Sequence, residues 1–289
     1  MKPIAKIKGH KAKPIDMVAW SANSQILASG APDSTVRLWD REGKSIKKID
    51  VPDYGELCVA WAPDGTLASA GNKVIRLWDS DGNALREFDA KTNAMTILAW
   101  SPDSKMIASD TIEKETNLWK PDGTHIKTLE GHTAHVSGIA WSPDNTLLIT
   151  VSSDAKMHLW EPTGTLIKVI KQHYESETSV AWAPDSKSFA VGTWLKKHIR
   201  IYDRDGNSDQ VIEGHKDKVS SVVWSSDGKM IISGSTDKTA MIWNPDGTLI
   251  EKLDINKAVT SVALSPDNQL LAVSSWDDKI LLYDLKELE

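Results

Sequence analysis

The feature that most constrains this chain of 289 residues is a sequence unit that recurs seven times at a period near 41 residues. Its first anchor is an apolar run ending in tryptophan, at Trp20, Trp61, Trp100, Trp141, Trp182 and Trp224, with Leu264 in the last copy. Its second anchor ends in Leu-Trp-Asp or a variant, at Trp39, Trp78, Trp119, Trp160, Tyr202, Trp243 and Tyr283. No linker interrupts the copies, so the repeat predicts one domain over residues 1–289.

Each copy predicts four short strands. In the best-formed copy, residues 131–164, the apolar runs are four to six residues long and bounded by turn residues, a pattern typical of strands joined by hairpins. In the first copy the predicted strands are 15–20, 25–29, 35–40 and 45–49. One sheet of four strands cannot bury both of its faces alone, whereas seven sheets stacked around a ring can.

The Gly-His opening, the Trp-Asp ending and the period together resemble the WD40 repeat family over essentially the whole chain. The resemblance implies an all-β fold, a seven-bladed β-propeller of four-stranded antiparallel blades. In WD40 proteins the N-terminal strand completes the last blade. Residues 3–8 read as such a strand, and the last copy, which ends in residues 283–289, has no room for its own fourth strand. We therefore expect the N-terminal strand to close the ring and to remove its exposed edges.

The resemblance also implies a hydrogen-bonded set of His, Ser or Thr, Asp and Trp in a blade. Three copies match it fully, with His10, Ser29, Asp33 and Trp39; His132, Thr150, Asp154 and Trp160; and His215, Ser233, Asp237 and Trp243. A His-Asp-Ser grouping could indicate a hydrolase triad. The threefold occurrence, the strand position of the hydroxyl and the lack of a Gly-x-Ser-x-Gly elbow favour a structural role.

Other copies depart from this set. Asn72, Glu113 and Lys196 stand at the aspartate position of copies two, three and five, and Val273 replaces the hydroxyl residue of the last copy. We expect these blades to be held by apolar packing alone and to be the softer ones.

Composition narrows the function classes. The net charge of −6 disfavours a nucleic-acid partner, and no apolar run reaches the length of a membrane span. The N-terminus lacks the apolar region of a secretory signal, and the lone Cys58 allows no intrachain disulfide, so we expect a cytoplasmic protein with a buried, inert thiol. His125, His132 and His135 lack the spacing of a zinc site, and no glycine-rich phosphate loop is present. We expect no metal, no cofactor and a monomer.

Two tryptophans have no place in the repeat. Eleven of the thirteen are anchors, which leaves Trp194 and Trp276 in the turn between the second and third strands. Trp276 precedes Asp277, and Trp194 aligns with Thr236, which precedes Asp237. The resemblance implies that this turn lies on the Gly-His face and points toward partners, and tryptophan is enriched in interface hot spots. The alternative is loop packing over a neighbouring blade. Further candidates around them, in blades five to seven and one, are Lys218, Ser220, Thr236, Asp16 and Pro32.

The sequence thus predicts a non-catalytic scaffold that binds a protein or peptide on the face of these turns. One alternative is a designed or purely structural propeller without an evolved partner. Another is an enzyme that uses the central channel, which the apolar Val-Ala-Trp and Ile-Ala-Trp ends of the innermost strands disfavour.

Overall fold

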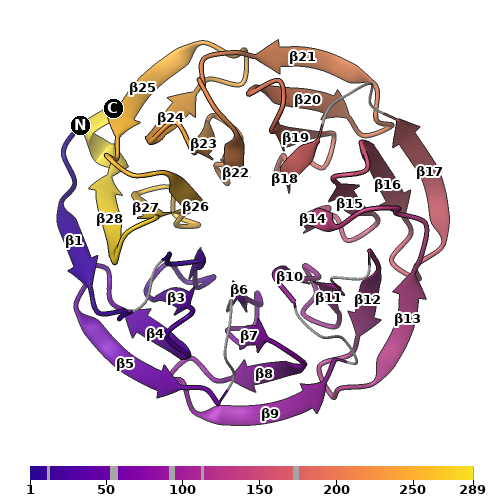
Figure 1. The fold of residues 1–289 in the computed structure, drawn as a ribbon, viewed down its shortest axis with the longest axis horizontal. Coiled ribbons are helices and arrows are strands. Elements are labelled where there is room, and N and C mark those ends of the chain that lie inside the picture. The colour runs from indigo at the N-terminus through magenta and orange to yellow at the C-terminus, as the bar shows by residue number, and fades with distance from the viewer. Residues whose placement is uncertain (12–13, 53–57, 91–94, 112–113, 172–175, 289) are drawn as a thin grey trace.

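The computed structural model describes all residues except 12–13, 53–57, 91–94, 112–113, 172–175 and 289. Its strands form seven four-stranded antiparallel sheets, the blades, arranged in a ring (Figure 1). Seven predicted copies therefore correspond to seven blades, and the predicted all-β propeller is confirmed.

Blades 1 to 4 each use four strands that are consecutive in the chain. Blade 1 contains β2 (Met17–Trp20), β3 (Leu27–Ala31), β4 (Thr35–Trp39) and β5 (Ser45–Asp50). Blade 2 contains β6 (Cys58–Trp61), β7 (Leu67–Gly71), β8 (Val74–Trp78) and β9 (Ala84–Asp89). Blade 3 contains β10 (Leu98–Trp100), β11 (Ile107–Asp110), β12 (Thr116–Trp119) and β13 (His125–Leu129). Blade 4 contains β14 (Val136–Trp141), β15 (Leu148–Ser152), β16 (Lys156–Trp160) and β17 (Leu166–Lys171).

Blades 5 and 6 repeat this arrangement, while blade 7 joins both ends of the chain. Blade 5 contains β18 (Glu177–Trp182), β19 (Ser188–Thr193), β20 (Ile199–Asp203) and β21 (Ser208–Ile212). Blade 6 contains β22 (Val219–Trp224), β23 (Ile231–Ser235), β24 (Thr239–Trp243) and β25 (Leu249–Asp254). Blade 7 contains β26 (Val259–Leu264), β27 (Leu270–Ser275), β28 (Lys279–Asp284) and β1 (Ala5–Lys8).

In blade 7, β1 pairs antiparallel with β28, with Ala5 opposite Leu282 and Lys8 opposite Lys279. A short 3₁₀ helix, η1 (Leu285–Leu288), follows β28, and the two termini lie side by side at the outer edge of the ring (Figure 1). Because the first and last strands share one sheet, the ring is held together by backbone hydrogen bonds at the point where the chain begins and ends.

The core lies between the blades. Buried apolar side chains of the described residues form seven clusters, one at each contact between neighbouring blades. The tryptophan of an inner strand also reaches the preceding blade, because Trp141 Nε1 donates to the Ala99 carbonyl at 3.2 Å and Trp182 Nε1 to the Ala140 carbonyl at 3.2 Å. The first anchor of the repeat is thus a contact between blades.

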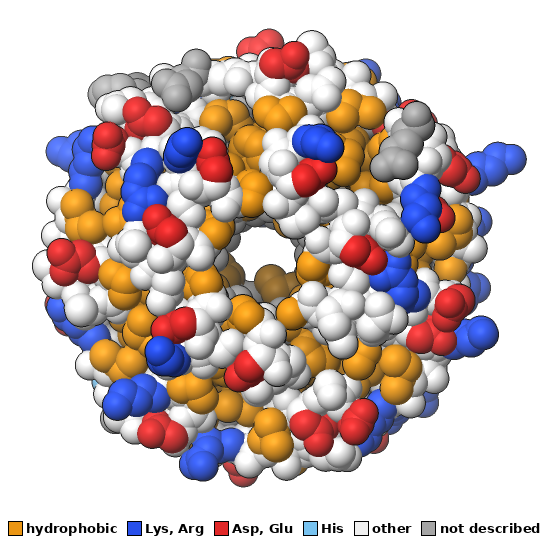
Figure 2. Space-filling view, turned by 180° about the vertical axis from the view of Figure 1, so that it is seen from behind, with side chains coloured by type: hydrophobic (Ala, Val, Ile, Leu, Met, Phe, Trp, Pro, Cys, Tyr) orange, Lys and Arg blue, Asp and Glu red, His pale blue; other side chains and the backbone are white. Residues whose placement is uncertain are grey.

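The inner strands surround a central channel. Figure 2 shows this channel open at the middle of the ring, with apolar side chains around it and charged side chains of both signs interspersed toward the rim. Within the described ranges, no helix has the length and apolar character needed to cross a bilayer.

Candidate partner-binding face

The hydrogen-bonded set of blade 1 is complete and buried. Trp39 Nε1 donates to Ser29 Oγ at 2.9 Å, and the same oxygen lies 2.8 Å from His10 Nε2. On the opposite side of the imidazole, His10 Nδ1 lies 3.0 Å from Asp33 Oδ1. A neutral His10 therefore donates its Nδ1 proton to Asp33 and accepts the Ser29 hydroxyl at Nε2.

Blades 4 and 6 repeat this geometry. The imidazole Nε2 lies 2.8 Å from the hydroxyl in blade 4 and 2.7 Å in blade 6, and the tryptophan Nε1 donates to that hydroxyl at 3.0 and 2.9 Å. The His-to-Asp contact is 3.2 Å in blade 4 and 2.9 Å in blade 6. The members are His132, Thr150, Asp154 and Trp160 in blade 4, and His215, Ser233, Asp237 and Trp243 in blade 6.

The ionisation of these groups fits a structural role. Burial lowers the pKa of His10 and of His132, so both imidazoles are neutral at pH 7. Burial acts to raise the pKa of Asp33, but hydrogen bonds from the Thr35 hydroxyl and the Lys11 amide outweigh it and lower that pKa. Because the Ser29 hydroxyl is fully buried between the imidazole and an indole, it has no open side for a substrate.

The hydrogen-bonded set contains a fifth member in blades 1 and 6, which the comparison of the seven sequence copies did not identify. Thr35 Oγ1 donates to Asp33 Oδ1 at 2.6 Å in blade 1, and Thr239 Oγ1 donates to Asp237 Oδ1 at 2.6 Å in blade 6. Both threonines lie two residues after the aspartate, whereas blade 4 has Lys156 there. This spacing is the signal that could have identified them.

The prediction that the departing blades are held by apolar packing alone is wrong for blades 2 and 3. Trp78 Nε1 donates to Ser69 Oγ at 2.9 Å, and Trp119 Nε1 donates to Ser109 Oγ at 3.0 Å. The indole-to-hydroxyl bond therefore persists without the His and Asp partners, because it needs only two neighbouring strands. Glu113, named for blade 3, lies outside the described residues.

The histidines of blades 3 and 4 have separate partners. His125 Nε2 lies 3.0 Å from Asn117 Oδ1, while His135 Nε2 lies 3.4 Å from Asp110 Oδ2. His132 instead stacks on His158, with ring centroids 3.8 Å apart. In the part of the chain that the structure describes, no group of three or more His, Cys, Asp or Glu side chains could hold a metal ion.

Trp194 and Trp276 are the most exposed tryptophans, with 53% and 63% of their surface accessible. Trp194 follows β19 and its amide donates to the Ser176 carbonyl at 2.9 Å; Trp276 follows β27 and its amide donates to the Ala258 carbonyl at 2.9 Å. In blade 6 the amide of Thr236 makes the equivalent bond, donating to the backbone carbonyl of Lys218 at 3.0 Å. The three residues therefore occupy equivalent turns on one face of the ring, and the two indoles flank blade 6.

Trp194 has a cationic neighbour. The Lys218 ammonium lies 5.5 Å from the centroid of the Trp194 ring, within the range of a cation–π contact. Lys218 is partly buried, and this burial lowers the pKa of its ammonium. Leu195, which follows Trp194, is 61% exposed. The turn thus presents an aromatic ring, an aliphatic side chain and a partly desolvated cation together.

The other predicted contact residues are less accessible. Ser220 lies on β22, and its hydroxyl donates to the Val259 carbonyl of blade 7 at 2.7 Å, so it joins two blades. Thr236, Asp16 and Pro32 are partly buried in blades 6 and 1. The exposed part of the predicted patch is therefore centred on Trp194 and Trp276.

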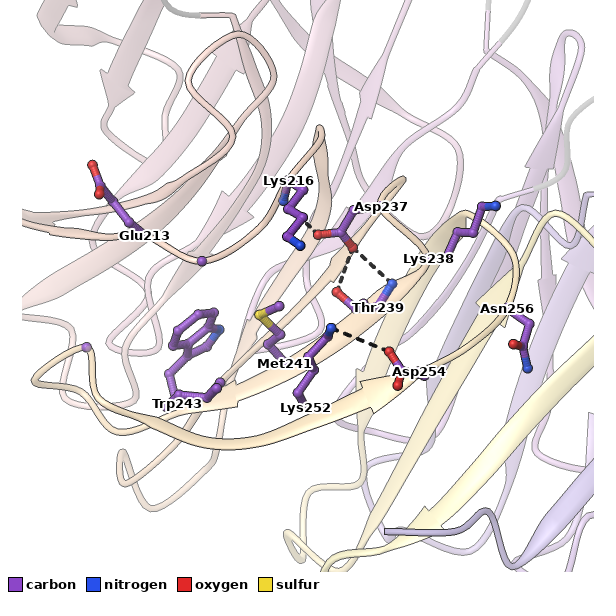
Figure 3. Close-up of a pocket in the computed structure, with 13 residues that line it drawn as sticks. Glu213, Lys216, Asp237, Lys238, Thr239, Met241, Trp243, Lys252, Asp254 and Asn256 are labelled. Carbon is purple, nitrogen blue, oxygen red and sulfur yellow. Dashed lines mark hydrogen bonds and ion pairs between the residues drawn. The ribbon is translucent and has the colours of Figure 1, made fainter.

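A cavity of about 740 Å³ opens on the side of blade 6, and the sequence comparison did not predict it (Figure 3). Met241, Trp243 and Leu249 supply its apolar lining, and Lys252 pairs with Asp254 at 3.5 Å beside them. Met241 stands where copies one, two and five carry arginine two residues before the second anchor.

Comparisons with known proteins agree with this architecture. Residues 1–197 match the family described as the IFT122 first beta-propeller, and residues 206–244 and 247–284 match the WD domain, G-beta repeat. A segment of 70 residues is 31% identical to THO complex subunit 3 of Arabidopsis thaliana. This segment covers 24% of the present chain and 22% of that protein, so the chain matches a minor part of the relative.

Proposed function

We propose that this chain, which belongs to the WD40-type β-propellers of the IFT122 first beta-propeller family, is a non-catalytic scaffold that binds a protein partner through Trp194 and Trp276. The relative THO complex subunit 3 is by its name a component of a complex, which fits a role in assembly. We further propose that residues 1–289 act as one domain, since β1 and β28 share a sheet, and that the chain works in the cytoplasm.

The observation that carries the proposal is the exposure of two indoles at equivalent turns. The chain has thirteen tryptophans, and the other eleven are buried or partly buried. Each exposed ring would remove roughly 100 Å² of apolar surface from water on binding, worth about 2.5 kcal/mol. Their backbone amides donate to carbonyls of a neighbouring loop, so the backbone of both turns is already ordered before binding.

The buried sets support the non-catalytic part of the proposal. The hydroxyls of Ser29, Thr150 and Ser233 are inaccessible to solvent, and each already contacts an imidazole and an indole. A nucleophile must reach its substrate, whereas these groups contact only each other.

Binding to the immobilised chain tests the proposal. Trp276→Ala should abolish capture of a partner that binds the wild type, while the variant melts within a few degrees of the wild type. Leu85→Ala is the matched control, because Leu85 is 57% exposed on the outer strand β9, away from the proposed face. Equal loss of binding in both variants, or loss of folding in Trp276→Ala, would assign the indole to packing.

A further inference from the structure

The turns around Trp194 and blade 6 carry an unusual number of lysines for a chain with a net charge of −6. Residues 194–198, 213–218, 236–238 and 255–258 contain six, which are Lys196, Lys197, Lys216, Lys218, Lys238 and Lys257. The same segments contain three carboxylates, Glu213, Asp217 and Asp237, and Asp237 already accepts hydrogen bonds within the His215 set. The turns around Trp194 and blade 6 are therefore locally basic, whereas the turn of Trp276 carries Asp277 and Asp278.

The six ammonium groups form no ion pair with any residue in the described part of the chain. Some lysines elsewhere on the ring are paired: Lys229 lies 3.6 Å from Asp227, and Lys279 lies 3.6 Å from Asp277. The positive charge around Trp194 is thus not neutralised by the described residues, and a negatively charged partner would meet little competition for it.

Lys218 is the best-placed of these cations. Its backbone amide donates to Asp217 Oδ1 at 2.8 Å and its carbonyl accepts from Thr236, so its position is fixed at both ends of the residue. Its ammonium lies over the Trp194 ring and is partly desolvated. A carboxylate arriving there would form a charge-assisted hydrogen bond in a partly dry site, where such bonds are stronger than in water.

Two more of these lysines lie at the cavity of blade 6. Figure 3 shows Lys216 and Lys238 on either side of Asp237, and both line the cavity. The rest of the lining is mixed: Met241 and the half-exposed Leu249 supply apolar surface, and Glu213 and the ion pair of Lys252 with Asp254 also line the cavity. A peptide that crosses this rim would meet both cations and apolar surface.

We propose that the partner binds through an acidic segment that crosses the rim between blades 5 and 6. One carboxylate pairs with Lys218 above Trp194, further carboxylates meet Lys216 and Lys238, and an apolar side chain enters the cavity beside Met241. This inference rests on the proposed function, since it takes Trp194 as part of the binding face.

A synthetic peptide tests the charge requirement. The probe is an acetylated, amidated Glu-Glu-Leu-Glu-Glu peptide, titrated while the indole N–H signal of Trp194 is followed by NMR. It should shift that signal at low salt and lose affinity as salt is raised, while the corresponding peptide with Gln in place of Glu should not bind. Absence of any shift, or equal binding of the Gln peptide, would overturn the proposal.

Variants at Lys218 locate the interaction. Lys218→Gln should weaken the peptide by about tenfold or more, and Lys218→Arg should keep most of the affinity. Lys229→Gln, on the turn between β22 and β23, is the matched control and should bind like the wild type. Binding unchanged in Lys218→Gln, or tighter binding of a single-stranded DNA decamer at the same site, would contradict an acidic peptide. Thermal melting checks that the Lys218 variants fold.

The two proposals fail in different ways. If Trp276→Ala abolishes capture of the natural partner and Lys218→Gln leaves it unchanged, the binding face is correct and the acidic segment is wrong. If neither substitution reduces capture, the binding face itself is wrong.

Discussion

The stacked imidazoles of blade 4 should make the protein sensitive to acid. The rings of His132 and His158 lie 3.8 Å apart with an angle of 9° between their planes, and His158 is only 2% exposed. Its Nδ1 has no hydrogen-bond partner in the described part of the chain. Burial, with a smaller contribution from His132, lowers the pKa of His158 from 6.5 to about 4.

The magnitude follows from the difference between the folded and unfolded pKa values. An unfolded chain protonates this histidine near pH 6.5, whereas the folded chain resists protonation until about pH 4. Between these values the unfolded state binds more protons, so the free energy of unfolding falls as the pH falls. At about 1.4 kcal/mol per pKa unit, the loss is about 3 kcal/mol between pH 7 and pH 4.

His158→Met isolates this contribution. Blade 6 carries Met241 at the same position of β24, so the side chain type is compatible with the blade. The free energy of unfolding is measured by urea unfolding, followed by tryptophan fluorescence, at pH 7, 5.5 and 4. Between pH 7 and pH 4 it should fall by about 3 kcal/mol more in the wild type than in the variant. The carboxylates titrate in both proteins and cancel in the comparison. Parallel pH profiles for the two proteins would refute the assignment of the acid sensitivity to His158.

Three further predictions follow from buried groups. His132→Ala should lower the free energy of unfolding by about 1–3 kcal/mol, measured by urea unfolding at pH 7, because it leaves buried polar partners unpaired; an unchanged transition would contradict this. Ser69→Ala should cost about 1 kcal/mol through the lost bond from Trp78, and no change there would show that apolar packing holds blade 2 after all. The Cys58 thiol is buried, and burial raises its pKa, so it should react with a disulfide reagent only as fast as the chain opens. A fast reaction whose rate does not depend on denaturant would contradict this burial.

The fold was readable from the sequence because its anchors are physical contacts. The inner-strand tryptophans bridge neighbouring blades, as Trp141 does toward Ala99, and the second anchor donates to a hydroxyl across a strand pair, as Trp160 does toward Thr150. Both contacts depend on spacings that a linear chain displays directly. Strand ends were less accurate: the strand predicted from residue 15 begins at Met17 and the one predicted to residue 40 ends at Trp39.

The features that sequence reasoning missed depend on neighbours that are distant in the chain. His158 on β16 stacks on His132, which lies in the loop before β14, and no spacing rule within one copy indicates that their rings stack. The cavity of blade 6 is lined by residues from several separate stretches of the chain, such as Gly214, Met241 and Asn256, which no single repeat position identifies. The exposure of Trp194 and Trp276 could be inferred because both lie outside the anchor positions. Their cationic neighbour Lys218 was named as a candidate, but its place above the Trp194 ring required the structure.

Oxidative footprinting of the tryptophans tests the proposed binding face most directly. In the free chain, hydroxyl radicals should modify Trp194 and Trp276 much faster than the other eleven tryptophans, because only these two are more than half exposed. In the complex with a partner, mass spectrometry should show both indoles protected while an exposed residue such as Leu85 on β9 reacts as before. Undiminished oxidation of Trp194 and Trp276 in a saturated complex would contradict the account and place the partner elsewhere on the ring.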